Sequence, residues 1–188
     1  MRKFNLVLLS LLLAIFLFGC AQGRTSELER QVADLQSQLT AAQQKLQGTA
    51  ERTVALYFIK ETPDNFYLAP ELRRLDATQC TPEKVLQELI AGPKDPNLKP
   101  VLPQNVRVLG VKVEKGLATV DFSREITHLN VGSRGEVLVL AAIANTLTKL
   151  PEIERVQILV EGKKIETLAG HVDITQPLGR NEEVLKLG

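Results

Sequence analysis

The 188-residue sequence has no tryptophan, only two cysteines and only two histidines. With so few thiols and imidazoles, a zinc site of the usual Cys and His type is almost excluded. An excess of one charge is also missing, since the formal net charge is +1. Nucleic-acid-binding domains usually carry a basic surface, so this balance argues against a nucleic-acid partner. No glycine-rich phosphate-binding loop is present either.

The remaining composition is that of a folded protein. Hydrophobic residues make up 44% and charged residues 24% of the chain, which excludes wholesale disorder. The length suggests one domain with appendages.

The N-terminus has the pattern of a secretory signal. Arg2 and Lys3 precede an apolar run over residues 6–18, which is short for a membrane-spanning helix. The run ends at Gly19 and Cys20 and resembles the lipobox of bacterial lipoproteins. This resemblance predicts a signal peptide over residues 1–19, cleavage between Gly19 and Cys20, and a lipidated segment over residues 20–25. An uncut signal anchor with an idle thiol at Cys20 is the alternative.

An amphipathic helix is predicted for residues 26–47, after the signal peptide. Ser26 and Glu29 have the spacing of a capping box. Apolar residues then alternate at spacings of four and three, as in a coiled coil. This seam consists of Leu28, Val32, Leu35, Leu39, Ala42 and Leu46. Self-association through the seam is one interpretation, and an amphipathic spacer that lifts the domain off the membrane is the other. Residues 48–52 are interpreted as a linker.

Beyond the linker the pattern becomes globular. Residues 54–59 form a continuous apolar run of strand length. Residues 66–75 are predicted to return as a second strand, which Pro70 places at a sheet edge. A helix is predicted over residues 82–91 with Thr81 as its N-cap, and a proline-rich loop follows it.

The second half of the domain repeats this alternation. Residues 106–113 are predicted to be a strand with a bulge near Gly110, because the apolar phase changes there. Ala118, Val120 and Phe122 alternate with polar residues and predict its hairpin partner. Ser133 and Glu136 suggest another capping box, and residues 137–144 are apolar on every side of the helix behind it. Residues 155–161 are the next strand, and residues 165–168 are candidates for a returning strand.

Hairpins dominate this order of elements. The expected fold class is therefore α+β, with a mixed or antiparallel sheet and two main helices on one of its faces. The expected domain covers residues 53–180, and residues 181–188 form a tail.

Several short motifs in this domain match one family in order and spacing. They are Leu56-Tyr57-Phe58, Arg73, Leu89-Ile90-Ala91-Gly92-Pro93, Pro103, Val120-Asp121-Phe122-Ser123, Gly132-Ser133, Glu136, Thr146-Leu147, Val160-Glu161-Gly162, Gly170-His171 and Asp173. The domain resembles the GerMN domain of the GerM family of sporulation and spore-germination proteins. The resemblance implies an α-β-β-α-β core similar to the ring-building motif of secretion-system rings. It also implies an envelope role, in assembly or in sporulation and germination.

The candidate site residues have structural interpretations beside functional ones. His171 and Asp173 are weak metal or ligand candidates, because two ligands do not make a zinc site. Asp121 and Ser123 lack the glycine elbow of a nucleophile and are interpreted as a strand-end cap. Cys80 is expected to be an inert thiol. Four aromatic residues are candidates for a glycan or peptide surface, although the first two are expected in the core: Tyr57, Phe58, Phe66 and Tyr67.

Together these patterns predict a lipid-anchored binding or scaffold protein on the extracytoplasmic side of a membrane. No catalytic residue, metal or cofactor is expected. The expected partners are the membrane, through the N-terminal lipid, other envelope proteins, and a second copy through the coiled coil. A peptidoglycan hydrolase and a ligand-sensing lipoprotein are the alternatives, and the latter requires a concave pocket.

Overall fold

The protein is described by a computed structural model that covers residues 27–43 and 50–185. The chain separates into two compact units, Met1–Thr49 and Ala50–Gly188. Cys20, Gly19, Ser26 and Leu46 lie outside the described residues, so the predictions for the lipid anchor and the first helix cap stay predictions.

Residues 27–43 of the first unit are helical, as the heptad pattern predicts. The described members of the seam are solvent-exposed, with exposures from 51% at Val32 to 64% at Leu35. Ala42 is exposed as well. The described part of this helix therefore presents an exposed apolar stripe.

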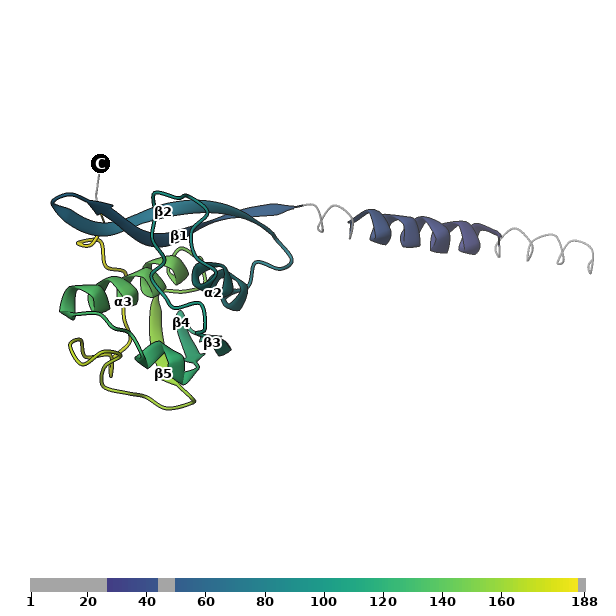
Figure 1. The fold of residues 1–188 in the computed structure, drawn as a ribbon. Coiled ribbons are helices and arrows are strands. Elements are labelled where there is room, and N and C mark those ends of the chain that lie inside the picture. The colour runs from purple at the N-terminus through teal and green to yellow at the C-terminus, as the bar shows by residue number, and fades with distance from the viewer. Residues whose placement is uncertain (1–26, 44–49, 186–188) are drawn as a thin grey trace, which may run out of the picture. The chain divides into compact units, whose positions relative to one another are not determined.

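The second unit begins with a long antiparallel hairpin (Figure 1). Strand β1 (Glu51–Thr62) pairs with β2 (Asn65–Asp76) in an unbroken register from Glu51 opposite Asp76 to Thr62 opposite Asn65. The strand starts two residues before the predicted domain boundary at residue 53. Pro70 lies on β2, and the two strands form a sheet of their own.

Helix α2 (Pro82–Ile90) begins where the sequence predicts. The Thr81 hydroxyl oxygen accepts a hydrogen bond of 3.2 Å from the backbone N–H of Lys84, and Pro82 stands at the first position. The apolar stripe of the helix is buried. It consists of Val85, Leu86, Leu89 and Ile90.

A second sheet follows, with the strand order β3-β4-β5. Strand β3 (Val108–Glu114) pairs antiparallel with β4 (Leu117–Phe122), and the predicted bulge lies between Val108 and Gly110. Lys115 and Gly116 form the turn with positive φ angles of 50° and 81°, as a tight two-residue hairpin requires. Strand β5 (Arg155–Val160) pairs parallel to β4.

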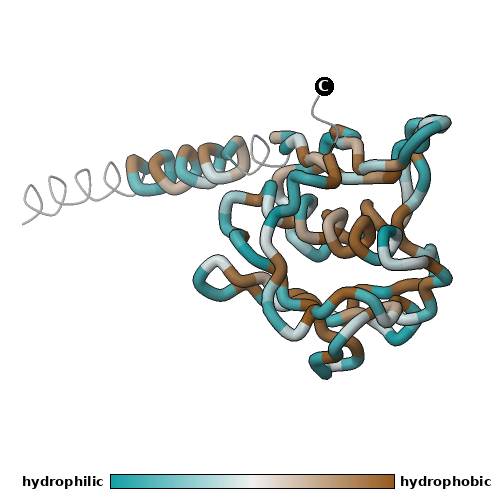
Figure 2. The backbone as a smooth tube through the Cα atoms, turned by 90° about the vertical axis from the view of Figure 1, so that its left-hand side faces the viewer, coloured by the Kyte–Doolittle hydropathy of each residue, from teal (hydrophilic) through white to brown (hydrophobic). Residues whose placement is uncertain are grey.

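Helix α3 (Ser133–Leu147) lies between the two sheets (Figures 1 and 2). It packs against β1 and β2 on one side, against β5 on the other, and against α2. A short 3-10 helix, η1 (Arg124–Thr127), precedes it. This sandwiched position explains why residues 137–144 are apolar around the whole helix. Helix α3 is therefore buried by other elements of its own domain.

The residues after β5 form a C-terminal strap, which we define as residues 163–185. Leu178 exchanges two backbone hydrogen bonds of 2.8 and 2.9 Å with Val156 on the edge of β5. Leu68 of β2 donates a backbone hydrogen bond of 2.8 Å to the carbonyl of Val184. The strap therefore connects the free edges of the two sheets, and residues 181–185, assigned to the tail from the sequence, pack on the domain.

Three sequence expectations need correction. The strands form two sheets on opposite sides of α3 instead of one sheet with helices on one face. Ser133 is not a capping residue, because α3 has Gly132 as its N-cap and no side chain caps it. Residues 165–168 form no strand, although Val160 and Lys163 make an isolated bridge at the turn.

Candidate functional site

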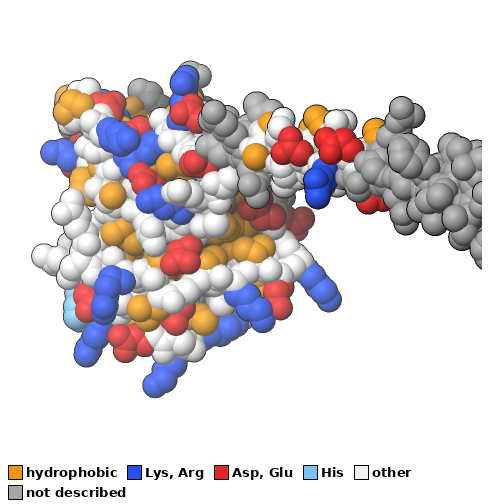
Figure 3. All heavy atoms as spheres, turned by 90° about the vertical axis from the view of Figure 1, so that its right-hand side faces the viewer, with side chains coloured by type: hydrophobic (Ala, Val, Ile, Leu, Met, Phe, Trp, Pro, Cys, Tyr) orange, Lys and Arg blue, Asp and Glu red, His pale blue; other side chains and the backbone are white. Residues whose placement is uncertain are grey.

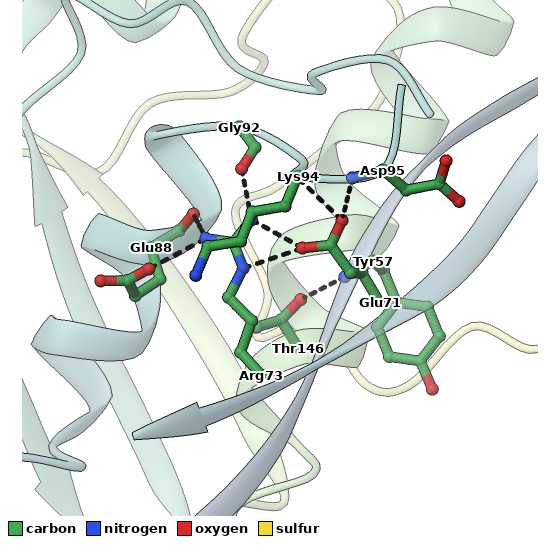
Figure 4. Close-up of polar contacts among 8 residues, drawn as sticks. All are labelled: Tyr57, Glu71, Arg73, Glu88, Gly92, Lys94, Asp95 and Thr146. Carbon is green, nitrogen blue, oxygen red and sulfur yellow. Dashed lines mark hydrogen bonds and ion pairs between the residues drawn. The ribbon is translucent and has the colours of Figure 1, made fainter. Parts of the chain in front are cut away.

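A buried arginine joins strand β2 to helix α2 (Figure 4). Arg73 of β2 is 5% exposed. Its guanidinium donates hydrogen bonds to the carboxylates of Glu71 at 2.8 Å and Glu88 at 2.9 Å, and to the backbone carbonyl of Gly92 at 2.5 Å. We call these four residues the Arg73 cluster. Because Gly92 closes α2, the cation also lies at the negative end of the helix dipole.

The second carboxylate oxygen of Glu71 extends the cluster into the proline-rich loop. It accepts hydrogen bonds of 2.8 Å from the backbone N–H groups of Lys94 and Asp95. Burial raises the pKa of Glu71, but the hydrogen bonds from Asp95, Arg73 and Lys94 outweigh burial and hold the pKa below its ordinary value. The pKa of Glu88 is lowered in the same way, against burial, by Arg73 and Lys84. Arg73 and Lys84, whose ammonium lies 3.2 Å from Glu88, together balance the two carboxylates, which points to a structural role.

Glu136 forms a second buried polar site. Its carboxylate is fully buried and accepts three hydrogen bonds of 2.8 Å, from the backbone N–H groups of Leu168, Ala169 and His171. The carboxylate predicted to complete a capping box instead holds the start of the C-terminal strap on α3. Three N–H donors compensate the burial of the charge.

Further along α3, two side chains fix the later part of the strap. Asn145 exchanges two hydrogen bonds of 2.7 and 2.8 Å with the backbone of Asn181. Arg180 lies over the ring of Tyr57 at 5.9 Å from its centroid and donates to the Tyr57 hydroxyl at 3.3 Å. Thr146 accepts a hydrogen bond of 3.2 Å from the backbone N–H of Tyr57, so α3 also covers the edge of β1 (Figure 4).

An apolar pocket remains between α3 and the strap. Its volume is about 160 Å³. We call it the α3 pocket, and it is lined by Val137, Leu140, Ala141, Ala144, Val172, Leu178, Gly179 and Asn181. A cavity of roughly 150 Å³ lined by aliphatic side chains holds one benzene-sized molecule. The α3 pocket is thus large enough for one aliphatic or aromatic side chain.

A shallower hollow lies between α2 and β3. It is lined by Gln87, Ile90, Val106, Arg107 and Val108. Figure 3 shows apolar side chains gathered across the middle of this face, with charged side chains around them. The hollow is a surface depression whose lining includes the polar side chains of Gln87 and Arg107.

The structure separates most of the site residues predicted from the sequence. The Asp173 carboxylate accepts a hydrogen bond of 2.8 Å from the backbone N–H of Thr175, which lowers its pKa. His171 contacts Glu136 through its backbone N–H. Among the described residues, no group of three or more His, Cys, Asp or Glu side chains is placed to hold a metal.

The strand-end interpretation of Asp121 and Ser123 is confirmed. Asp121 accepts a hydrogen bond of 2.8 Å from the backbone N–H of Gly162, and the Ser123 hydroxyl accepts one of 3.0 Å from the backbone N–H of Arg107. Cys80 is a buried free thiol.

The four aromatic residues divide as expected. Tyr57 and Phe58 are buried at 4% and 0% exposure, whereas Phe66 is 37% exposed near the hairpin turn. Tyr67 is half-buried. Sequence reasoning did not identify the ion pairs of Arg73. The signal was present, because Glu71 and Arg73 are two residues apart on one strand and must share a face.

Within the described ranges, no helix is long and apolar enough to cross a membrane. The domain is defined by an α-β-β-α-β core. This core follows the β1–β2 hairpin in the sequence and consists of α2, the β3–β4 hairpin, α3 and β5.

This architecture and the sequence match known proteins. The model of the Germane family, described as sporulation and spore germination, matches residues 55–166, which is more than half of the chain. The spore germination protein GerM of Bacillus subtilis (strain 168) is 28% identical over 145 residues. The match covers 72% of this chain but 38% of GerM, so the chain spans less than half of that relative.

Solved structures show the same fold. The tandem GerMN domains of the sporulation protein GerM from Bacillus subtilis superpose with a TM-score of 0.60 and 26% identity, over 72% of this chain and 48% of that one. The first GerMN domain alone gives a TM-score of 0.58 and 27% identity, over 70% of this chain and 98% of that one. A candidate lipoprotein from Clostridium perfringens superposes with a TM-score of 0.52 and 26% identity, over 71% of this chain and 90% of that one.

These matches define the second unit as a GerMN domain. The chain belongs to the Germane family of sporulation and spore-germination proteins.

Proposed function

We propose that this protein is a lipid-anchored assembly component of the cell envelope, which carries one GerMN domain and self-associates through its N-terminal helix. The observation that carries the proposal is the apolar stripe on residues 27–43. Leu28, Leu35 and Leu39 are each at least 60% exposed and share one helix face. An exposed leucine seam of this kind is stabilised by a partner helix with the same pattern.

The anchor rests on the sequence around Gly19 and Cys20. The similarity to the candidate lipoprotein of Clostridium perfringens supports it. Two or more acyl chains at Cys20 hold a protein stably on a membrane. The GerMN domain then faces the extracytoplasmic side, where it contacts other envelope proteins. Membership of the Germane family favours a complex that acts in sporulation or germination.

The anchor is tested by labelling cells with a radioactive or clickable fatty acid. The parent chain is expected to take up the label and to fractionate with membranes, and Cys20→Ser is expected to lose both properties. Cys80→Ser is the matched control, because Cys80 is the only other cysteine. A Cys20→Ser chain that stays labelled would overturn the lipid anchor.

Self-association is tested in the same membranes by disulfide cross-linking. A cysteine at Leu35 is expected to form a cross-linked dimer on mild oxidation, since seam positions of paired helices face each other. A cysteine at Ser37, on the opposite face, is expected to cross-link weakly. Equal cross-linking at both positions, or none, would contradict pairing through the seam.

A ligand-sensing lipoprotein is a second candidate, favoured by the α3 pocket. Its lining is almost entirely aliphatic, which suits a small apolar ligand. Binding of an apolar ligand is expected to raise the melting temperature of the domain, and Ala141→Leu, which fills the pocket, is expected to abolish that shift.

A further inference from the structure

The turn of the β1–β2 hairpin forms an open hollow with the first turn of α3. The hollow has a volume of about 440 Å³ and is lined by residues 61–66 and Arg134. A second hollow of about 220 Å³ adjoins it and shares Thr62, Asn65 and Arg134. We define the hairpin-tip site as Glu61, Asp64, Asn65, Phe66 and Arg134.

Phe66 is the aromatic side chain of this site. It is 37% exposed, and the Arg134 guanidinium lies 4.9 Å from the centroid of its ring. Arg134 also donates hydrogen bonds of 2.7 Å to the side-chain oxygen of Asn65 and 3.0 Å to the backbone carbonyl of Phe66. These contacts hold the ring in place from one side. Because the ring is already held, a ligand that stacks on its exposed part binds with little entropic cost for ordering the side chains of the site.

Groups with spare hydrogen-bonding capacity surround the ring. Among the described residues, the carboxylates of Glu61 and Asp64 make no hydrogen bond or ion pair, and the amide nitrogen of Asn65 has no acceptor. The carboxylates accept hydrogen bonds and the amide donates them. The site thus offers both acceptors and a donor beside an apolar ring face.

The charge of the site selects among ligands. Glu61 and Asp64 line the larger hollow and Glu183 lines the smaller one, whereas Arg134 is the single cation among the described residues of the two linings. This excess of negative charge disfavours phosphate-rich and other polyanionic ligands. The two adjoining hollows also suit an extended ligand with repeated units better than a compact one.

We propose that the hairpin-tip site binds an uncharged sugar ring of an extended oligosaccharide. A pyranose ring presents C–H groups on one face, which stack on the electron-rich face of Phe66. Its hydroxyl groups donate to the carboxylates of Glu61 and Asp64 and accept from Asn65. Sugar binding is a function beyond assembly and needs neither the lipid anchor nor the helix seam, so it is tested separately from both.

The absence of tryptophan gives a direct fluorescence test on the full chain purified in detergent. Phe66→Trp places the only indole of the protein in the hairpin-tip site while it keeps an aromatic face. The probe is an uncharged β-linked trimer of N-acetylglucosamine. A saturable change in tryptophan emission is expected on titration. Leu72→Trp, on the same strand at a position that is 70% exposed and outside both hollows, is the matched control and is expected to show no change.

Calorimetry with the same trimer completes the test. Phe66→Ala is expected to weaken binding about tenfold or more relative to the parent chain, which corresponds to the loss of one aromatic stacking contact. Circular dichroism confirms that the variant stays folded. The proposal is overturned if the Phe66→Trp emission does not saturate, if Leu72→Trp responds equally, if Phe66→Ala binds as the parent does, or if polyphosphate competes for the site.

Discussion

The guanidinium of Arg73 donates a hydrogen bond of 2.5 Å to the backbone carbonyl of Gly92, which closes helix α2. This contact joins the β1–β2 hairpin to the α-β-β-α-β core. It acts together with the packing of β1 on α2 and α3 and with two backbone hydrogen bonds of 2.8 and 3.1 Å between Ile59 and Lys99. The Arg73 cluster is therefore expected to stabilise the fold of this GerMN domain.

Arg73→Ala is expected to lower the free energy of unfolding by about 3–5 kcal/mol, because it leaves the partly buried Glu71 without a cation and Glu88 with Lys84 alone. Arg74→Ala is the control. Its side chain is 77% exposed and its ion pair with Glu51 is 3.6 Å long, so it is expected to change stability by less than about 1 kcal/mol. Denaturant unfolding measures both. Equal effects of the two variants would contradict the structural role of the cluster.

The same cluster predicts a dependence of stability on pH. The pKa values of Glu71 and Glu88 lie below the ordinary value of 4.5 in the folded protein. At pH values between 4.5 and the lowered pKa values, the folded state therefore binds fewer protons than the unfolded state. Stability is therefore full above pH 4.5 and falls as the pH drops through the lowered values. Glu71→Gln is expected to make this decline shallower in urea titrations, and an unchanged slope would count against the assignment.

Glu136→Ala is expected to release the beginning of the C-terminal strap. Each buried N–H left without an acceptor costs roughly 1–3 kcal/mol. This part of the strap is therefore expected to open, so that its N–H groups bind water instead. Hydrogen exchange is expected to accelerate at the amides of Leu168, Ala169 and His171 and to stay unchanged in α2. The exposed Glu166→Ala is the control. Protection retained at all three amides would show that Glu136 does not hold the strap.

Leu140→Ala tests whether α3 is covered by its own domain. Leu140 is 4% exposed, so its truncation is expected to cost about 2–5 kcal/mol. Leu72→Ala is the matched control, because Leu72 is 70% exposed. Thermal melting of both variants gives the comparison. A melting temperature that Leu140→Ala leaves unchanged would instead indicate a surface reserved for a partner.

Local patterns predicted most elements of the domain. Thr81 with a following proline predicts the start of α2, and the shift of apolar phase at Gly110 predicts the bulge, because both signals depend on neighbouring residues. The division into two sheets was not predicted, since pairing between distant strands leaves no mark on a single strand.

Polar residues with distant partners were the hardest to interpret. Glu136 stands where a capping box predicts a local contact, but the backbone of Leu168 and His171 supplies its donors. The first turn of α3 also requires a glycine at position 135. A Cβ on Gly135 would lie 2.7 Å from the Cβ of Val131, which is too close. The exposed hairpin-tip site likewise depends on a contact between Phe66 and Arg134, which the sequence does not place together.

Sedimentation equilibrium of the chain from Ser26 onward measures assembly through the seam of residues 27–43. Two double variants are compared with the parent. Leu35→Glu with Leu39→Glu places two charges on the seam, and Ser37→Glu with Ala41→Glu places them at the same spacing on the other side of the helix.

Assembly through the seam predicts that the parent and the Ser37→Glu, Ala41→Glu chain sediment as oligomers of the same mass, and that the Leu35→Glu, Leu39→Glu chain sediments as a monomer. A monomeric parent, or an oligomer that survives both seam charges, would contradict it.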